Sequence, residues 1–208
     1  MMNSDSNRLQ HLPRQRGASL VVVMLVLLVV TVTGIAGARL ALLGEMSARH
    51  DRDTQIAFES AEAAIIDAEN EIDGVATTAC TALRTDKFLA KDFVMAAGTC
   101  GNTTADRGLC APVEEGSIAK PVWATVDFLD NNSTAVTTEY GAFTCRTFDA
   151  GSGVKPARAP RYIVERVPDR TPGKQADAFM YRITAMGFGP RVDTRTVVQV
   201  EYRKKDIE

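Results

Sequence analysis

Four cysteines are the residues of this chain whose chemistry is easiest to specify from the sequence. They are Cys80, Cys100, Cys110 and Cys145. An even number of cysteines in an exported chain is typical of disulfides, and four cysteines permit three pairings. We favour Cys100–Cys110 with Cys80–Cys145, because a bridge between the first two closes a short polar loop, which contributes about 3 kcal/mol in the chain-entropy model. A zinc site is the alternative, but the chain has no C-x-x-C pair and no histidine after His50.

Residues suited to catalysis are few. The two histidines fall before the apolar N-terminal run (His11) and on the exposed part of a predicted helix (His50), so neither is suited to a catalytic triad, and the chain has no glycine-rich phosphate loop. Oxygen ligands for calcium are offered by Asp127, Asp130, Asn131 and Asn132, although such clusters more often form turns. We expect no catalytic residue, no cofactor and no bound metal.

An apolar segment near the N-terminus indicates where these residues are located. Residues 17–38 contain no charge and are long enough to cross a hydrocarbon core of roughly 30 Å as a helix. Arg8, Arg14 and Arg16 precede the segment, so the positive-inside rule keeps the N-terminus in the cytoplasm and exports the rest.

Three interpretations of this segment predict different mature N-termini. A secretory signal peptide would be cut after the small residues Ala36-Gly37-Ala38, and an uncleaved anchor would keep residue 1. The third rests on a resemblance: Arg16-Gly17 followed by Ala18 and an apolar run resembles the site of prepilin peptidase. In that family the enzyme cuts after the glycine, here Gly17, and methylates the new amine, here that of Ala18. The resemblance implies a leader at 1–17 and a retained helix at 18–38.

The helical pattern continues beyond the apolar segment, which favours the prepilin interpretation. Residues 39–72 contain no proline, and apolar residues recur with 3-4-3-4 spacing at Phe58, Ala61, Ile65, Ala68 and Ile72. This spacing predicts an amphipathic continuation at 39–73 that buries Phe58 and Ile65 and ends at Gly74. The alternative is a membrane anchor followed by a separate amphipathic helix.

Several segments resemble the PilX group of minor pilins, which belong to bacterial type IV pilus assembly systems. They are residues 52–64 (RDTQIAFESAEAA), 161–165 (RYIVE), 181–187 (YRITAMG) and 197–202 (VVQVEY). The resemblance implies a subunit that is not an enzyme and that helps to start the pilus, at or near its tip. It implies other minor pilins, the major pilin, prepilin peptidase and the inner membrane as partners, with the C-terminal domain in the periplasm.

One position departs from the general pilin pattern. Most pilins have a glutamate at the fifth residue after the cut, where it neutralises the terminal amine of a neighbouring subunit, and here that residue is Val22. The next carboxylate, Glu45, is over 30 Å further along a helix. The resemblance therefore implies an initiating or terminal place for the subunit, as in the tip pseudopilins of type II secretion. Alternatively, Val22 is an ordinary membrane residue.

The exported part, residues 74–208, is long enough for one domain with its own core. We expect a short helix at 85–97 and strands at 121–128, 142–148, 161–167, 179–186 and 195–203. A helix followed by antiparallel strands predicts an α+β, pilin-like domain with the helix packed on the sheet.

The net charge bears on whether the protein binds nucleic acid. The chain has 24 basic and 26 acidic residues, and without residues 1–17 it has 21 and 25. A weakly acidic protein without a basic cluster argues against direct nucleic-acid binding. Two functions of other classes stay open, a tip-located adhesin or surface sensor and a type II secretion pseudopilin.

Overall fold

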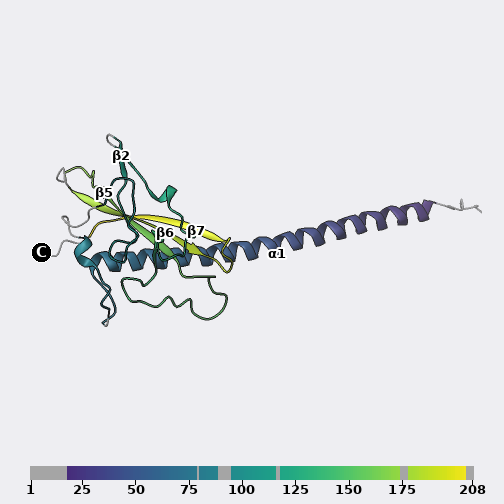
Figure 1. Ribbon diagram of the computed structural model, residues 1–208. Helices are drawn as coiled ribbons and strands as arrows, with labels where there is room; N and C mark the ends of the chain where they lie inside the picture. The colour runs from purple at the N-terminus through teal and green to yellow at the C-terminus, as the bar shows by residue number, and fades with distance from the viewer. Residues whose placement is uncertain (1–17, 79, 89–94, 116–117, 174–177, 205–208) are drawn as a thin grey trace, which may run out of the picture. The chain divides into compact units, whose positions relative to one another are not determined.

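The computed structural model describes residues 18–78, 80–88, 95–115, 118–173 and 178–204. The chain divides into two compact units, the first ending at Arg49 and the second beginning at His50. Both contain part of one α-helix, α1 (Ala18–Asp73), which is 56 residues long (Figure 1). The predicted helix from residue 18 to residue 72 is thereby confirmed as one continuous element.

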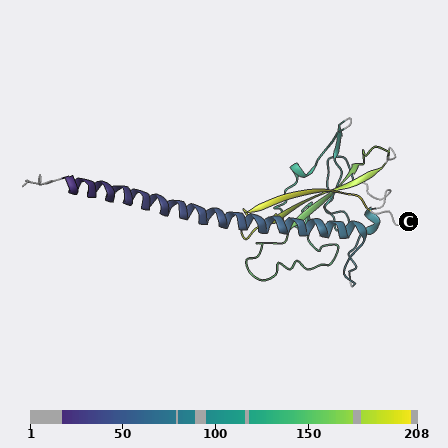
Figure 2. The ribbon, with the colours of Figure 1, turned by 180° about the vertical axis from the view of Figure 1, so that it is seen from behind.

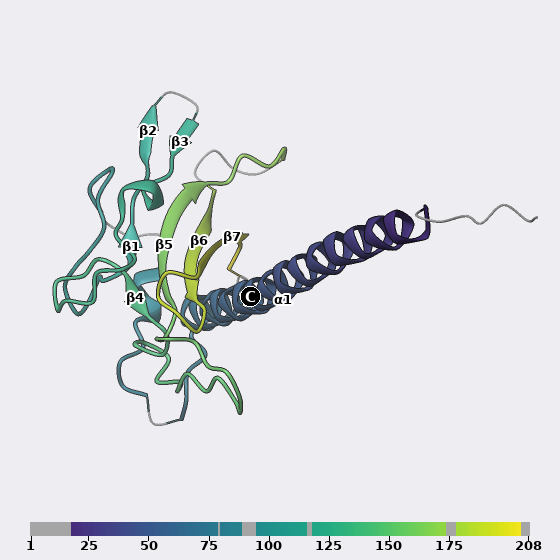
Figure 3. The same cartoon turned by 90° about the vertical axis from the view of Figure 1, so that its right-hand side faces the viewer.

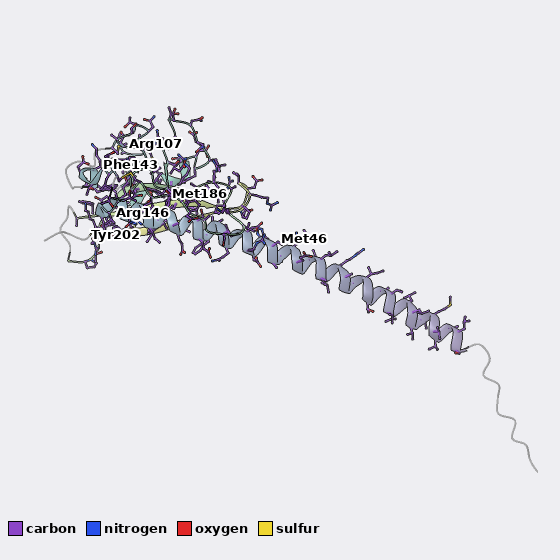
Figure 4. The ribbon with its side chains drawn as sticks, turned by 90° about the horizontal axis from the view of Figure 1, so that it is seen from below. Met46, Arg107, Phe143, Arg146, Met186 and Tyr202 are labelled. Atoms are coloured by element: carbon purple, nitrogen blue, oxygen red, sulfur yellow. A yellow bond between two sulfur atoms is a disulfide. The ribbon has the colours of Figure 1, made fainter. Side chains whose placement is uncertain are left out.

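The first unit contributes an apolar helix surface. Every large apolar side chain from Leu20 to Met46 is at least half exposed, and Met46 projects away from α1 (Figure 4). The helix includes an 18-residue window with a mean hydropathy of 2.8, none of it buried. Leaving so much apolar surface in water is unfavourable. The helix is long and apolar enough to cross a membrane.

The end of α1 has the chemistry predicted for Gly74. This residue follows Asp73 with a φ of 79°, a backbone conformation that glycine adopts without steric penalty. The amides of Gly74 and Val75 bond to the carbonyl oxygens of Glu71 and Asn70, at 3.2 and 2.7 Å. These two bonds form a Schellman motif, which satisfies carbonyl groups left free at the helix end.

In the second unit, the C-terminal part of α1 packs on a sheet. The sheet order is β1-β5-β6-β7, with β4 paired to the same strand β5 (Figure 3). The strands are β1 (Leu109–Cys110), β4 (Thr138–Glu139), β5 (Arg161–Pro168), β6 (Phe179–Phe188) and β7 (Arg195–Tyr202). The last three form an antiparallel meander as predicted, whereas β1 is parallel to β5, so the sheet is mixed. A hairpin of β2 (Val113–Glu115) and β3 (Ile118–Lys120) forms a separate small sheet.

The main core lies between α1 and the sheet, whose strands share one side of the helix (Figures 1 and 2). Ile65, Ala68 and Ile72 from α1 meet Tyr162 and Ile183 from the central strands, all of them buried. Each of the isoleucine side chains contributes on the order of 1.5–3 kcal/mol when fully buried. The predicted α+β, pilin-like fold is confirmed.

Phe58 was expected in this core, and that prediction is wrong, since Phe58 is 37% exposed. Ala57 and Ala61 face the sheet in its place, because the backbone of β6 approaches α1 closely there. A Cβ built on Gly187 would lie 2.1 Å from the carbonyl oxygen of Ala57 and 2.3 Å from the amide nitrogen of Ala61. Such a short separation leaves no room for an aromatic ring.

Two predicted strands are also wrong. Residues 121–128 contain a short 3-10 helix, η2 (Trp123–Thr125), because the Val122 amide donates to a side chain, that of Glu165, and not to a strand. Residues 142–148 form a turn followed by irregular chain, and the Thr144 hydroxyl of this segment bonds to Asp67 of α1. In the predicted helix 85–97 the structure has a 3-10 turn, η1 (Thr85–Phe88), and residues 95–97 are not helical. Residues 89–94 lie outside the described part.

Candidate functional site

The predicted processing site lies at the start of α1. Ala18 is the first residue of the helix, and Gly17 lies outside the described residues. Val22 is 57% exposed on the apolar surface of the helix. The sequence has no carboxylate between Ala18 and Glu45, and Glu45 is paired with Arg49 at 2.5 Å. The helix therefore offers no carboxylate near Val22. Cleavage after Gly17 and methylation of Ala18 stay predictions.

Small residues further along the same helix leave its surface open. A Cβ added to Gly34 or Gly37 would meet nothing within 4 Å. Glycine and alanine at four-residue spacing let membrane helices approach closely. This part of α1 can therefore accept another helix at short distance.

Within the second unit, a polar cluster connects the C-terminal end of α1 to strand β5 and to two loops. We call it the helix anchor; it comprises Asp67 and Glu71 with their partners Arg84, Thr144 and Tyr162. All five side chains are buried. Buried charged groups are costly unless they are paired, so the contacts of each member decide whether the cluster stabilises the fold.

Glu71 has a partner for each carboxylate oxygen. Its Oε1 lies 2.5 Å from Arg84 Nε, and its Oε2 accepts the Tyr162 hydroxyl at 2.7 Å. Burial raises the pKa of the Glu71 carboxyl, against the opposing effect of the Arg84 charge. Arg84 also donates to the Ala105 carbonyl at 3.2 Å, and its guanidinium stacks 3.5 Å above the Phe143 ring. This member of the anchor thus connects α1, the loop at Ala105 and strand β5.

Asp67 lies one helical turn earlier, and most of its partners come from the loop at residues 141–146, with the Tyr162 hydroxyl in addition. Its Oδ2 accepts the Gly141 amide at 2.8 Å, and its Oδ1 accepts the Thr144 hydroxyl. Burial raises the pKa of the Asp67 carboxyl. One donor to this helix carboxylate, Thr144, thus comes from the segment that was predicted as a strand at 142–148, and the other, Gly141, directly precedes it.

The structure joins the four cysteines in two disulfides. Cys80 is bonded to Cys145 and Cys100 to Cys110, which is the pairing favoured from the sequence. Cys110 is fully buried in a second cluster with Val122, Phe128 and Ile163. Cys145, by contrast, is exposed.

The loop considered for calcium is occupied by positively charged side chains. Arg158 donates to the Leu129 carbonyl at 3.2 Å, Arg161 to Asn131 Oδ1 at 2.8 Å, and Arg107 to the Ser133 carbonyl. Cations at these oxygens would repel a divalent ion. Within the described ranges no group of three His, Cys, Asp or Glu side chains is placed to hold a metal ion. The turn interpretation fits better, since Asp130 Oδ1 accepts the Asn132 amide at 2.9 Å.

The sequence analysis did not identify the helix anchor. A weak signal existed, because Asp67 and Glu71 each precede a residue of the predicted apolar stripe, Ala68 and Ile72. Helical geometry places such residues at the border of a buried face. Their partners come from distant segments, which no local pattern reveals.

An apolar N-terminal helix that continues into a helix-on-sheet domain is the pilin-like architecture. A family model for the PilX N-terminal region matches residues 16–65, and one described as the C-terminal part of the type IV pilus assembly protein PilX matches residues 94–204. The chain therefore belongs to the PilX family and is a type IV pilus minor pilin, a structural component of the pilus. No curated protein and no solved structure matches the chain.

Proposed function

We propose that this minor pilin helps to initiate the type IV pilus and occupies a place at or near its tip. Val22 is the observation that supports the proposal most strongly. A subunit added beneath existing ones needs a carboxylate near its N-terminus to neutralise a buried amine above it, and this chain has valine there. An unpaired buried charge costs on the order of 3–5 kcal/mol. The subunit can still accept the next one below it through its own amine.

The proposal includes maturation and location. Prepilin peptidase removes residues 1–17 after Gly17 and methylates Ala18, and residues 18–38 hold the protein in the inner membrane. The amphipathic part, residues 39–73, and the domain at 74–208 lie in the periplasm until assembly. The apolar, exposed surface of α1 supports this location, because it needs lipid or other helices to cover it.

Contacts with the other minor pilins and the major pilin are proposed for two surfaces of α1. The first is the apolar part with Gly34 and Gly37, where another helix can approach closely. The second is the outer face of the domain part, where Ile66 is 57% exposed beside Glu59 and Glu62. Glu59 and Glu62 are exposed, and residues 53–73 contain no basic residue, so this face favours a neighbour with positive charge.

A second candidate function is a tip-located adhesin or surface sensor. It is supported by the exposed residues 102–105 at the tip of the loop that the Cys100–Cys110 bridge closes. A loop fixed in this way binds with a smaller loss of conformational entropy than a free one.

Deletion of the chain separates the two functions. Loss of surface pili, counted by electron microscopy and restored by the wild-type gene, is expected for an initiating subunit. Normal piliation with lost attachment would contradict initiation and support the adhesin.

A further inference from the structure

We infer that the Cys80–Cys145 bridge is a thiol–disulfide exchange site, at which a dithiol partner opens the link that keeps Asp67 bonded within the second unit. The inference rests on the proposed export of the domain, because exchange partners of this kind act in oxidising compartments.

The two bridges differ in access. Cys80 and Cys100 are both half-buried, so the difference lies in their partners: Cys145 is exposed, whereas Cys110 is fully buried in a cluster with Val122, Phe128 and Ile163. Exchange requires a thiolate to reach a sulfur atom, so the rate depends on access to that atom. An external thiol therefore reaches the Cys80–Cys145 bridge more readily.

The bridge also holds an unfavourable backbone. Cys145 has a φ of 56°. Among the residues that the structure describes, no other non-glycine residue has a positive φ. Residues with a Cβ avoid this conformation. The Cys145 amide bonds to the Gly141 carbonyl at 2.9 Å, and the Thr77 amide bonds to the Thr144 carbonyl at 3.0 Å. Opening the disulfide removes the covalent restraint and lets this turn relax.

That turn provides the two strongest contacts of Asp67. The Gly141 amide and the Thr144 hydroxyl both donate to its buried carboxylate. Phe143 and Arg146, labelled in Figure 4, belong to the same stretch, and the Arg146 charge also faces Asp67. When the turn relaxes, Asp67 loses the Gly141 and Thr144 donors and keeps the Tyr162 hydroxyl, which Glu71 shares, while Glu71 also keeps Arg84. The last turns of α1 are then held mainly through Glu71.

The exchange balances in two steps. A thiolate of the dithiol attacks Cys145 Sγ, a mixed disulfide forms, and the Cys80–Cys145 bond breaks with Cys80 leaving as a thiolate that takes up a proton. The Phe143 carbonyl lies 3.3 Å from Cys80 Sγ and accepts the new S–H. The second thiol of the dithiol then attacks the mixed disulfide and releases Cys145. Two electrons pass from the dithiol, which becomes a disulfide, to the bridge, and a disulfide oxidant reverses both steps.

Graded reduction of the full-length protein in detergent tests the site. The oxidised protein is treated with dithiothreitol without denaturant, quenched with an alkylating reagent at intervals, and mapped by mass spectrometry. We expect Cys80 and Cys145 to be labelled at least about tenfold faster than Cys100 and Cys110, as access dictates. Equal rates, or faster labelling of Cys100 and Cys110, would overturn the inference.

Hydrogen exchange tests the link to Asp67. After selective reduction, the amides of residues 67–73 should exchange faster, and a Cys80→Ser/Cys145→Ser variant should show the same increase without reductant. Asp67→Asn in the oxidised protein serves as the comparison for a weakened contact at this point. Unchanged exchange in both the reduced protein and the double variant would reject the link. These measurements involve no pilus, so they can fail while the deletion result still supports the minor-pilin function, and the reverse also holds.

Discussion

The hydroxyl oxygen of Tyr162 and the carboxylate of Glu71 lie 2.7 Å apart, although 91 residues separate them in the chain. Both side chains are fully buried, so neither has water as an alternative partner. The contact joins the last turns of α1 to the first half of strand β5, and Arg84 completes it from a third segment. The contact fixes the C-terminal part of α1 to the sheet within the second unit.

Tyr162→Phe tests this contact. The variant keeps the ring in the core but leaves one oxygen of the buried Glu71 without its donor, which should lower the free energy of unfolding by about 1–3 kcal/mol. Urea unfolding followed by circular dichroism measures the change. Tyr202→Phe is the matched control, because its hydroxyl donates to Asp73 at 2.6 Å at a half-buried site. If Tyr202→Phe lowered the free energy of unfolding as much as Tyr162→Phe, the burial of the helix anchor would make no difference to the strength of the contact, against the expectation.

Gly187→Ala tests how closely β6 approaches α1. The new methyl group would lie 2.1 Å from the Ala57 carbonyl oxygen, so strand and helix must separate. We expect a loss of about 1–3 kcal/mol or more in the free energy of unfolding, as for other overpacked sites. Gly37→Ala makes the same change on an open helix surface and should not destabilise the protein. Equal midpoints of thermal unfolding for wild type and Gly187→Ala would contradict the packing described.

The raised pKa values of the anchor carboxyls predict an unusual dependence of stability on pH. Burial raises the pKa of Asp67 and Glu71 above their ordinary values of 3.8 and 4.5. A carboxyl with a raised folded-state pKa binds its proton more tightly in the folded protein. Its contribution is complete below the ordinary pKa and is lost as the pH rises through the folded-state pKa. Stability should therefore fall as the pH rises above the ordinary values.

Urea midpoints measured between about pH 5 and pH 8 check this expectation, with Asp67→Asn as the comparison, since an amide does not ionise in that range. Between these pH values, the urea midpoint of the variant should decrease less than that of the wild type. The pKa values of Asp106 and Asp169 are lowered, so their contributions change only below 3.8, outside this range. A midpoint that rises steadily from pH 5 to pH 8 would be inconsistent with raised pKa values in the anchor.

The elements that the sequence predicted correctly have regular patterns. The apolar run and the stripe that includes Ile65 and Ile72 predicted α1, and Gly74 predicted its end. The alternating, β-branched segments predicted β5, β6 and β7 to within two residues at each end. These features follow from backbone periodicity and from the conformational freedom of glycine, both of which are local properties.

The errors arose where tertiary contacts decide the structure. Phe58 fitted the apolar stripe, but the close approach of Gly187 gave its place to alanine. Residues 142–148 had strand-like composition, but the amides of Ala142 and Cys145 form turn bonds to the carbonyls of Glu139 and Gly141, and the Thr144 hydroxyl donates to Asp67. The helix anchor could not be predicted, because Glu71, Arg84 and Tyr162 meet only in the folded chain. For Val22, in contrast, the sequence and the resemblance to pilins are enough to propose the place of the subunit in the filament.

Val22→Glu tests the proposed place in the filament. The new carboxylate can neutralise the amine of a subunit above, which removes a penalty on the order of 3–5 kcal/mol for insertion in the shaft. Immunogold labelling of sheared pili should then find the variant along the filaments, whereas the wild type is confined to the tips. Val23→Glu adds the same charge one position away, about 100° around the helix, and should not have this effect. Wild-type protein distributed evenly along filaments would refute the tip position.

The mature N-terminus tests the account most directly. Protein purified from the membrane of its own bacterium is digested, and the N-terminal peptide is sequenced by mass spectrometry. The account predicts a chain that begins at Ala18 with a methylated amine, and a Gly17→Val variant that keeps residues 1–17. A mature chain that begins at Arg39 would establish a secretory signal peptide, remove the membrane helix from the mature protein, and contradict assembly into a pilus.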